Sequence, residues 1–232
     1  MTVAAVTVHY QTPDMLRLAV ESFRKYYPAV PLLIIDNGSD EAGRHAVQDS
    51  ESKYPAVTRG LYLSENIFHG PAMHRAMSEV AEDLVFFFDT DTEMLQGGLL
   101  ETMASLFEQD LLLYAAGKTA VVNARGFHAA EGTTIVQTPS MMIRRSLYHQ
   151  LPPFEHRGMP TLANFQLAHR MKYRFADVPV EHSIRHDGRG TAGKFGYGLG
   201  LRGKMEFAVE KIVEIWSKSA ATKAQRHKDV IT

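Results

Sequence analysis

The sequence contains no cysteine, and this absence excludes disulfide bonds, zinc sites built on thiolates and cysteine nucleophiles. It also lacks any apolar run long enough to cross a bilayer, so no membrane span is predicted. Positive and negative charges nearly cancel, leaving a net charge of −1, which gives no reason to expect binding to nucleic acid or to an acidic membrane surface. Residues 1–8 have no basic flank and run straight into polar residues, so they predict a strand and not a signal peptide. We therefore expect a cytoplasmic protein.

The first half of the chain alternates between apolar runs and segments with helical spacing. Four apolar runs predict strands, at residues 3–9, 32–35, 57–63 and 84–88. A helix is predicted after each of the first three runs: from Pro13 with Thr12 as its N-cap, around 41–53, and from Gly70-Pro71. This alternation with short loops predicts an α/β fold with a mostly parallel central sheet flanked by helices.

The second half of the chain is less regular. Its patterns predict helices over 98–107, 161–173 and 205–216, a short helix near Ser146, and strands over 111–116, 133–136, 140–145 and 175–180. No linker divides the chain, so we expect one domain over residues 1–219, followed by a flexible polar tail over 220–232.

Each predicted strand of the first half ends in polar residues: His9-Tyr10, Asp36-Asn37, Asn66 and Asp89-Thr90-Asp91. Ligands of parallel α/β sheets bind beyond the carboxyl ends of the strands, so these residues are expected to converge. The two acids of the last group are the most informative. Ionised carboxylates are costly to bury without a partner, and hard divalent cations take oxygen ligands. The alternative is that these acids only cap a turn.

These four pieces, in this order and together with His186, resemble the GT-A glycosyltransferases of the family 2 type. The resemblance covers the first half of the chain well and the rest in outline. It implies that a sugar is moved from a nucleoside diphosphate donor, a UDP-sugar first and a GDP-sugar next, with Mn²⁺ or Mg²⁺ as cofactor. The implied acceptor is a sugar, a lipid-linked compound or a small molecule. It also divides the domain into a nucleotide-sugar-binding half, 1–95, and an acceptor half, 96–219.

The resemblance assigns roles to individual residues. Asp89 would contact the ribose or the metal, Asp91 would bind the metal on the diphosphate, and His186 would complete the metal shell. Apart from the resemblance, His69 and His74 flank the Gly-Pro turn and are expected to have hydrogen-bonded structural roles. Six positions would contact the nucleotide and the donor sugar: His9, Tyr10 and Asp36 at the base, and Asn66, Gly70 and Arg75 further along the donor.

The stretch from Arg185 to Lys204 is rich in glycine and in cations and contains a single acid. A departing diphosphate needs positive charge, and fixed cations supply it together with a metal. Glycine allows mobility and a close approach of the backbone to a ligand. We therefore expect a lid over about 185–204 that orders over the diphosphate, with Arg189 and Lys194 among its contacts. The alternative is a solvated surface loop.

The chain departs from the family pattern on the acceptor side. Inverting members carry a Glu-Asp pair at the start of the helix predicted here over 161–173, and Pro160 and Thr161 stand in those places. Neither can accept a proton from the acceptor hydroxyl. The candidate substitutes are Glu155 and His156. The absence of the pair is also compatible with retaining chemistry.

Two other functions are compatible with the pattern. The first is a catalytically silent GT-A-like module that only binds a nucleotide, which the missing acid pair favours. The second is a sugar nucleotidyltransferase. That class is disfavoured because residues 11–14, after the first strand, are not a glycine-rich basic loop suited to phosphate.

Overall fold

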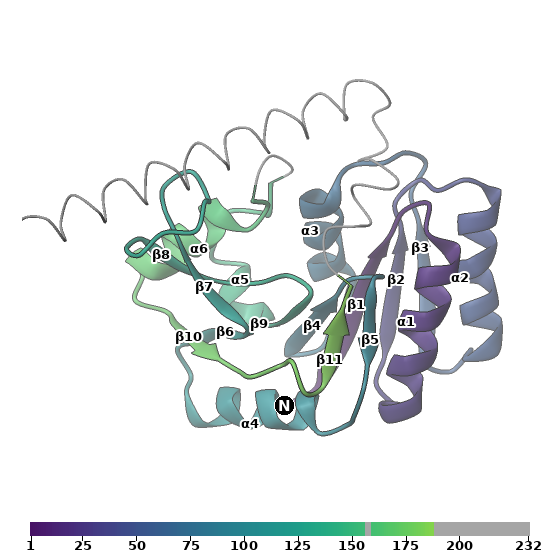
Figure 1. The fold of residues 1–232 in the computed structure, drawn as a ribbon, viewed down its shortest axis with the longest axis horizontal. Helices are drawn as coiled ribbons and strands as arrows, with labels where there is room; N and C mark the ends of the chain where they lie inside the picture. The colour runs from purple at the N-terminus through teal and green to yellow at the C-terminus, as the bar shows by residue number, and fades with distance from the viewer. Residues whose placement is uncertain (156–158, 188–232) are drawn as a thin grey trace, which may run out of the picture.

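The central sheet has seven strands in the order β10-β6-β9-β4-β1-β2-β3 (Figure 1), in a computed structural model that describes residues 1–155 and 159–187. All neighbouring strands are parallel except β9, which runs antiparallel to β4 and to β6. The predicted α/β fold with a mostly parallel sheet is confirmed. The strands are Val3–His9 (β1), Leu32–Asp36 (β2), Thr58–Tyr62 (β3), Leu84–Phe88 (β4), Leu113–Gly117 (β6), Ser140–Arg144 (β9) and Arg174–Asp177 (β10).

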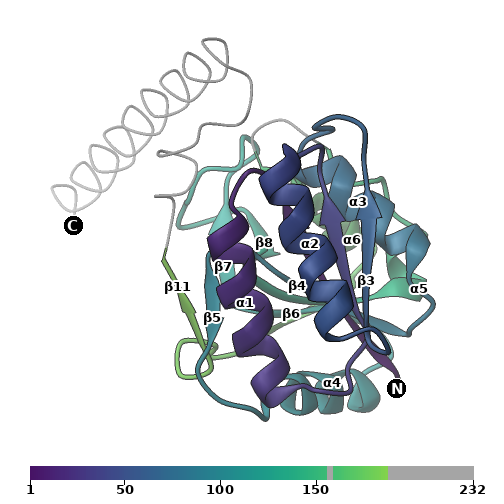
Figure 2. The same cartoon turned by 90° about the vertical axis from the view of Figure 1, so that its right-hand side faces the viewer.

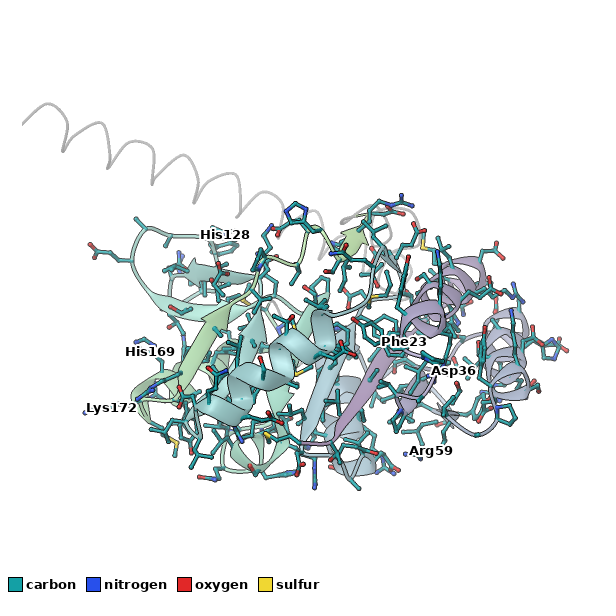
Figure 3. The ribbon with its side chains drawn as sticks, turned by 90° about the horizontal axis from the view of Figure 1, so that it is seen from below. Phe23, Asp36, Arg59, His128, His169 and Lys172 are labelled. Carbon is teal, nitrogen blue, oxygen red and sulfur yellow. The ribbon has the colours of Figure 1, made fainter. Side chains whose placement is uncertain are left out.

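Helices cover both faces of the sheet because successive strand residues point to opposite sides. In β1, Ala5 packs with the helices of one face and Ala4 with those of the other. The first face carries α1 (Pro13–Tyr26), α2 (Glu41–Lys53) and α4 (Leu99–Gln109), and Figure 2 shows α1 and α2 side by side on it. Phe23 of α1, labelled in Figure 3, stacks there on Phe88 of β4 with 5.1 Å between ring centroids. The second face carries α3 (His69–Glu79), α5 (Arg145–Tyr148) and α6 (Leu162–Arg170).

Two small antiparallel sheets complete the described part of the chain. One pairs β5 (Thr92–Met94) with β11 (Ile184–His186), and the other pairs β7 (Thr119–Val122) with β8 (Thr133–Val136). Strand β8 has its predicted bounds. Strands β5, β7 and β11 were not predicted, and β11 matters most because it brings a distant segment to the end of β4.

Two helix ends differ from expectation in instructive ways. Thr12 precedes α1 as predicted, but its hydroxyl does not cap the helix and instead lies 3.3 Å from the hydroxyl of Thr90. The helix predicted over 161–173 ends at Arg170 because Lys172 has a left-handed φ of 61°. The amide of Tyr173 then bonds back to the carbonyl of Ala168 at 3.0 Å, a Schellman-type ending.

Within residues 1–155 and 159–187, no helix combines the length and the apolar character that crossing a bilayer requires. The predicted helix 205–216 and the tail 220–232 lie outside the described residues.

Candidate functional site

The candidate site lies at the carboxyl ends of β1, β2 and β4. Strand β1 has β2 on one side and β4 on the other, although β4 follows three strands later in the chain. The strand order therefore reverses beside β1. In open parallel sheets, this reversal leaves the crevice in which ligands bind.

Asp89 and Asp91 occupy the turn that follows β4. The turn is closed by Thr92, whose amide and hydroxyl both bond to the carbonyl of Asp89, at 3.2 and 2.7 Å. The next strand, β5, begins at Thr92, so the turn is held between two strands. The side chains of Asp89 and Asp91 are 26% and 10% exposed, so both carboxylates are largely withdrawn from water.

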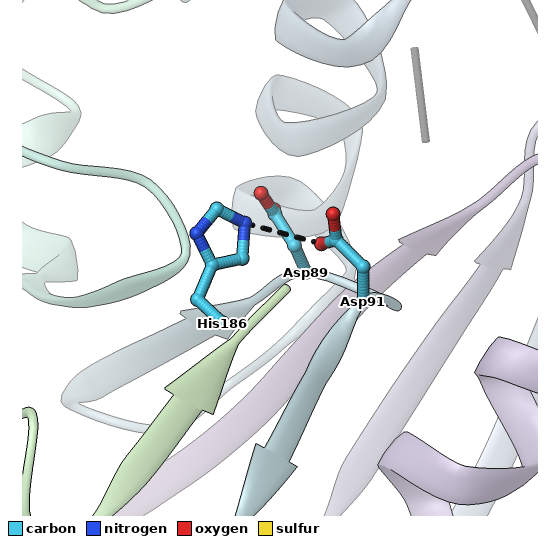
Figure 4. A group of neighbouring side chains, drawn as sticks. All are labelled: Asp89, Asp91 and His186. Carbon is cyan, nitrogen blue, oxygen red and sulfur yellow. Dashed lines mark ion pairs between the residues drawn. The ribbon is translucent and has the colours of Figure 1, made fainter. Parts of the chain in front are cut away.

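His186 reaches this turn through the pairing of β11 with β5. The register places His186 opposite Thr92 and Arg185 opposite Glu93. An ion pair between Arg185 and Glu93 and a hydrogen bond of 3.0 Å from the amide of Asp187 to the carbonyl of Asp91 hold the two strands together. As a result, the Nε2 atom of His186 lies 3.2 Å from Oδ1 of Asp91 (Figure 4).

Asp89, Asp91 and His186, here called the metal trio, offer ligand atoms that all lie within 4.8 Å of one another. Burial raises the pKa of Asp89, and the charge of Asp91 raises it further, while His69 and His186 oppose this shift. The hydrogen bond to Asp91 raises the pKa of His186. Two carboxylates and one imidazole are a donor set that suits Mn²⁺ or Mg²⁺, so the residues present fit the implied cation.

His9 and Asp36 form a row across β1 and β2 under the first turn of α2. They are register partners, and both side chains are fully buried. Asp36 accepts a hydrogen bond from the amide of Ser39 at 3.0 Å and lies 3.5 Å from Nε of Arg44. Among the residues that the structure describes, Oδ2 of Asp36, the atom nearest Arg44, and Nε2 of His9 have no hydrogen-bond partner, and neither atom is exposed to solvent. Contact of these two residues with a nucleobase stays a prediction, as does that of the half-buried Tyr10.

Asn37 is a residue whose role the sequence did not reveal. Its buried side chain donates to Oδ1 of Asn66 at 3.1 Å and accepts from the amide of Ile67 at 3.0 Å. Gly38 has a φ of 76°, and a β-carbon there would overlap the backbone of Glu65. The turn after β2 thus fixes the loop that leads into α3, and with it the position of Asn66.

A family model described as glycosyl transferase family 2 matches residues 4–168. The chain belongs to this family. No curated protein matches the chain. Its backbone is similar to three kinds of solved glycosyltransferase structure: the mannosyltransferase PcManGT from Pyrobaculum calidifontis in complex with GDP-Man and Mn²⁺ (TM-score 0.62, 15% identity), GalNAc-T7 with UDP, GalNAc and Mn²⁺ (0.60, 13%), and TarS 1-349 from S. aureus (0.56, 16%).

These alignments cover 76, 80 and 79% of this chain and 54, 43 and 60% of the three structures, so the chain spans about half the length of the proteins it matches. At such low identities the likeness establishes the fold. The GT-A fold and the family 2 resemblance predicted from the sequence are therefore confirmed.

In this family 2 chain, the loop before α3 contains backbone strain. Phe68 has φ 72° and ψ 166°, a region that residues other than glycine almost never occupy. The next residue, His69, has its Nε2 atom 3.8 Å from Oδ1 of Asp89. A β-carbon at Gly70 would overlap the carbonyl oxygen of Glu155. Strain of this kind persists only where the surrounding structure imposes it, and it gathers at functional sites.

Replacing Phe68 by glycine is expected to leave the protein more stable than replacing it by alanine, by about 1 kcal/mol. Both substitutions remove the same ring, so the difference between their free energies of unfolding reports the backbone strain at position 68. Relief of about 1–3 kcal/mol of strain outweighs the roughly 0.4–1 kcal/mol by which glycine favours the unfolded chain. Equilibrium unfolding in urea measures the difference. Leu95 has no positive φ and serves as the control. There the alanine variant should be more stable than the glycine variant. Alanine more stable than glycine at position 68 would contradict the strain.

Arg75 is not brought to the metal trio by the fold of this family 2 chain. Its guanidinium lies 2.7 Å from Glu79, which also pairs with Arg59 near the start of β3. The start of β3 is at the opposite edge of the sheet from the carboxyl ends of the strands. A donor contact by Arg75 remains only a sequence prediction.

The region predicted to bind the acceptor is partly described. The first turn of α6 contains no acid, and Thr161 before it is buried. Glu155 is exposed, and its amide bonds to the carbonyl of Pro160 at 2.9 Å. His156 lies outside the described residues, as do Arg189, Lys194 and all of the predicted lid beyond Asp187.

Proposed function

We propose that this family 2 chain moves a sugar from a nucleoside diphosphate donor, a UDP-sugar first and a GDP-sugar next, to a sugar, lipid-linked or small-molecule acceptor. The observation that carries the proposal is the metal trio at the point where the strand order reverses. The UDP complexes of GalNAc-T7 and TarS and the GDP-Man complex of PcManGT support a nucleotide-sugar donor.

The chain's own residues have separable tasks in this proposal. Asp91 and His186 hold the cation, and Asp89 binds it or the ribose. A bound Mn²⁺ or Mg²⁺ supplies Lewis-acid stabilisation of the departing diphosphate. The β5–β11 pairing keeps His186 beside Asp91. The Asn37–Asn66 bond holds the loop from which Asn66 and Gly70 would contact the donor.

Glu155 is the candidate that the described residues support as general base. Its carbonyl lies against Gly70, in the same turn of α3 as His69, which faces Asp89. Glu155 therefore lies near the donor side of the site with its side chain exposed. A carboxylate there is suited to accept the proton of an acceptor hydroxyl as the bond to the sugar forms.

Glu155→Gln is expected to lower the rate of sugar transfer about 100-fold and to leave nucleotide affinity unchanged, because a base acts only on the acceptor. Glu101→Gln, at an exposed position on α4, is the matched control and should behave like the parent. Transfer kinetics at saturating donor measure the effect. Parental rates for Glu155→Gln would remove this residue from the reaction and leave His156 or a mechanism without a dedicated base.

A panel of UDP- and GDP-sugars, incubated with the protein and Mn²⁺ or with EDTA, tests the proposed activity. Release of nucleoside diphosphate from one donor, only with the metal, is the expected result. The missing acid at α6 supports one rival, a silent nucleotide-binding module. Metal-dependent binding of nucleotides, without release of nucleoside diphosphate from any combination of donor and acceptor, would favour that rival.

A further inference from the structure

His69 lies beside the metal trio without belonging to it. Its Nε2 atom is 3.8 Å from Oδ1 of Asp89, within ion-pair range, and its side chain is 38% exposed. Within the described residues, the trio is the sole group of acids and histidines with metal-binding spacing, and His69 is not a member. Sequence reasoning gave His69 a structural role, as it did for His74. For His74 the structure agrees, with a bond of 2.8 Å to the hydroxyl of Tyr148.

The residues on both sides of His69 constrain the backbone at this position. Phe68 adopts its strained conformation immediately before it. Gly70 follows immediately, and a β-carbon at this position would overlap the carbonyl oxygen of Glu155. The amide of Phe68 bonds to Oδ1 of Asn66 at 2.8 Å, which connects the strained residue to the loop anchored by Asn37. These constraints fix the first turn of α3 between the turn after β4 and residue 155.

Asp89 therefore faces a histidine on α3, while Asp91 faces His186 on β11. A carboxylate that binds a cation is normally held in place by a second polar group, which fixes its orientation. His69 lies at ion-pair distance from Oδ1 of Asp89, and an imidazole held there would leave Oδ2 to face a cation.

We propose that His69 is a positioning residue that orients Asp89 for cation binding. The proposal rests on the proposed function in one respect, since it takes the metal trio as the cation site. It extends that function by adding the first turn of α3 to the part of the site that binds the donor. It predicts that the cation affinity depends on a hydrogen-bond donor at position 69, although this residue is not itself a ligand.

The test is a titration of the full chain with Mn²⁺ alone. Binding is measured as the loss of the free Mn²⁺ signal in electron paramagnetic resonance. His69→Ala should weaken Mn²⁺ binding about 10-fold, because loss of a supporting partner has an effect of this size. His69→Gln keeps a donor near the position of Nε2 and should stay within about threefold of the parent. His45→Ala, at an exposed position on α2, is the control and should have no effect. Thermal unfolding of each variant establishes that the fold is intact.

The outcomes separate this proposal from the proposed function. Parental affinity in His69→Ala, with loss of binding in His186→Ala, overturns the positioning role and leaves the metal trio standing. Equal weakening in His69→Ala and His69→Gln also overturns it, because the imidazole would then be a direct ligand or a purely steric element. Parental affinity in both His69→Ala and His186→Ala removes the metal trio, and the proposed function loses its main support. If His69→Ala fails to fold, His69→Phe keeps a ring without a donor and carries the same expectation.

Discussion

Asp91→Asn should reduce donor turnover about 1,000-fold at saturating Mn²⁺, because the substitution removes one of the charges that hold the cation on the diphosphate. Asparagine keeps the shape of the side chain, so packing around this largely buried position is preserved. Asp91 also holds His186 at 3.2 Å, and the neutral amide would weaken that contact. Steady-state release of nucleoside diphosphate, with and without acceptor, measures the change.

Asp49→Asn is the matched control for this prediction. Asp49 lies on α2 with a side chain that is 65% exposed, in a surface pair with Arg17, and such pairs contribute little. Its variant should turn over like the parent. If Asp91→Asn kept turnover within about threefold of the parent, the carboxylate would not be part of the reacting site.

Arg24→Ala is expected to destabilise the protein by about 4 kcal/mol, through loss of a buried hydrogen-bond network. Arg24 on α1 is 4% exposed and donates to three carbonyls and one hydroxyl. The acceptors are the carbonyls of Tyr27, Val30 and Val57, at 3.1, 2.7 and 2.7 Å, and the hydroxyl of Thr58 at 2.9 Å. Burial lowers the pKa of Arg24 to about 10, so it remains charged at neutral pH. Alanine would remove all four of these bonds in a partly to fully buried region, and of the acceptors the carbonyl of Val57 would keep the bond from the amide of Leu32 at 2.7 Å.

The measurement for Arg24 is equilibrium unfolding in urea. Arg17→Ala removes an exposed arginine from the same helix and should change the free energy of unfolding by no more than about 0.5 kcal/mol. Arg24→Lys keeps the charge but not the planar fork, and should also be destabilising. A loss below about 1 kcal/mol in Arg24→Ala would show that water or neighbouring groups replace the guanidinium.

The sequence predicted the first four strands and three helices because each has a recognisable local pattern. The apolar run 84–88 needs no distant information to be recognised as a buried strand, and Pro13 marks the start of α1. The same patterns placed polar residues at the carboxyl ends of the strands, and resemblance then added His186. The grouping of Asp89, Asp91 and His186 was predictable for this reason.

What the sequence did not reveal depends on contacts between distant segments. Strands β5 and β11 have three residues each, too few for a periodic signal, and they pair across about ninety positions of the chain. The antiparallel β9 enters the sheet between two strands that run the other way, which no local pattern indicates.

The sequence predicted a structural role for His69 but not its contact with Asp89, for a related reason. Its place beside Asp89 follows from the backbone of Phe68, which has a conformation that its residue type disfavours. A sequence pattern built on preferred conformations cannot anticipate an exception of this kind. Asn37 was similarly missed, because its function is a pair of bonds to a loop almost thirty residues away.

The most direct test of the cation site is calorimetric titration of the parent protein with UDP and with GDP, in Mn²⁺ and again in EDTA. Binding of one nucleotide that appears with Mn²⁺, weakens at least 10-fold in EDTA and is lost in Asp91→Asn is the result expected of a diphosphate held through the metal trio. Equal affinity in Mn²⁺ and EDTA, unchanged by Asp91→Asn, would contradict the central claim.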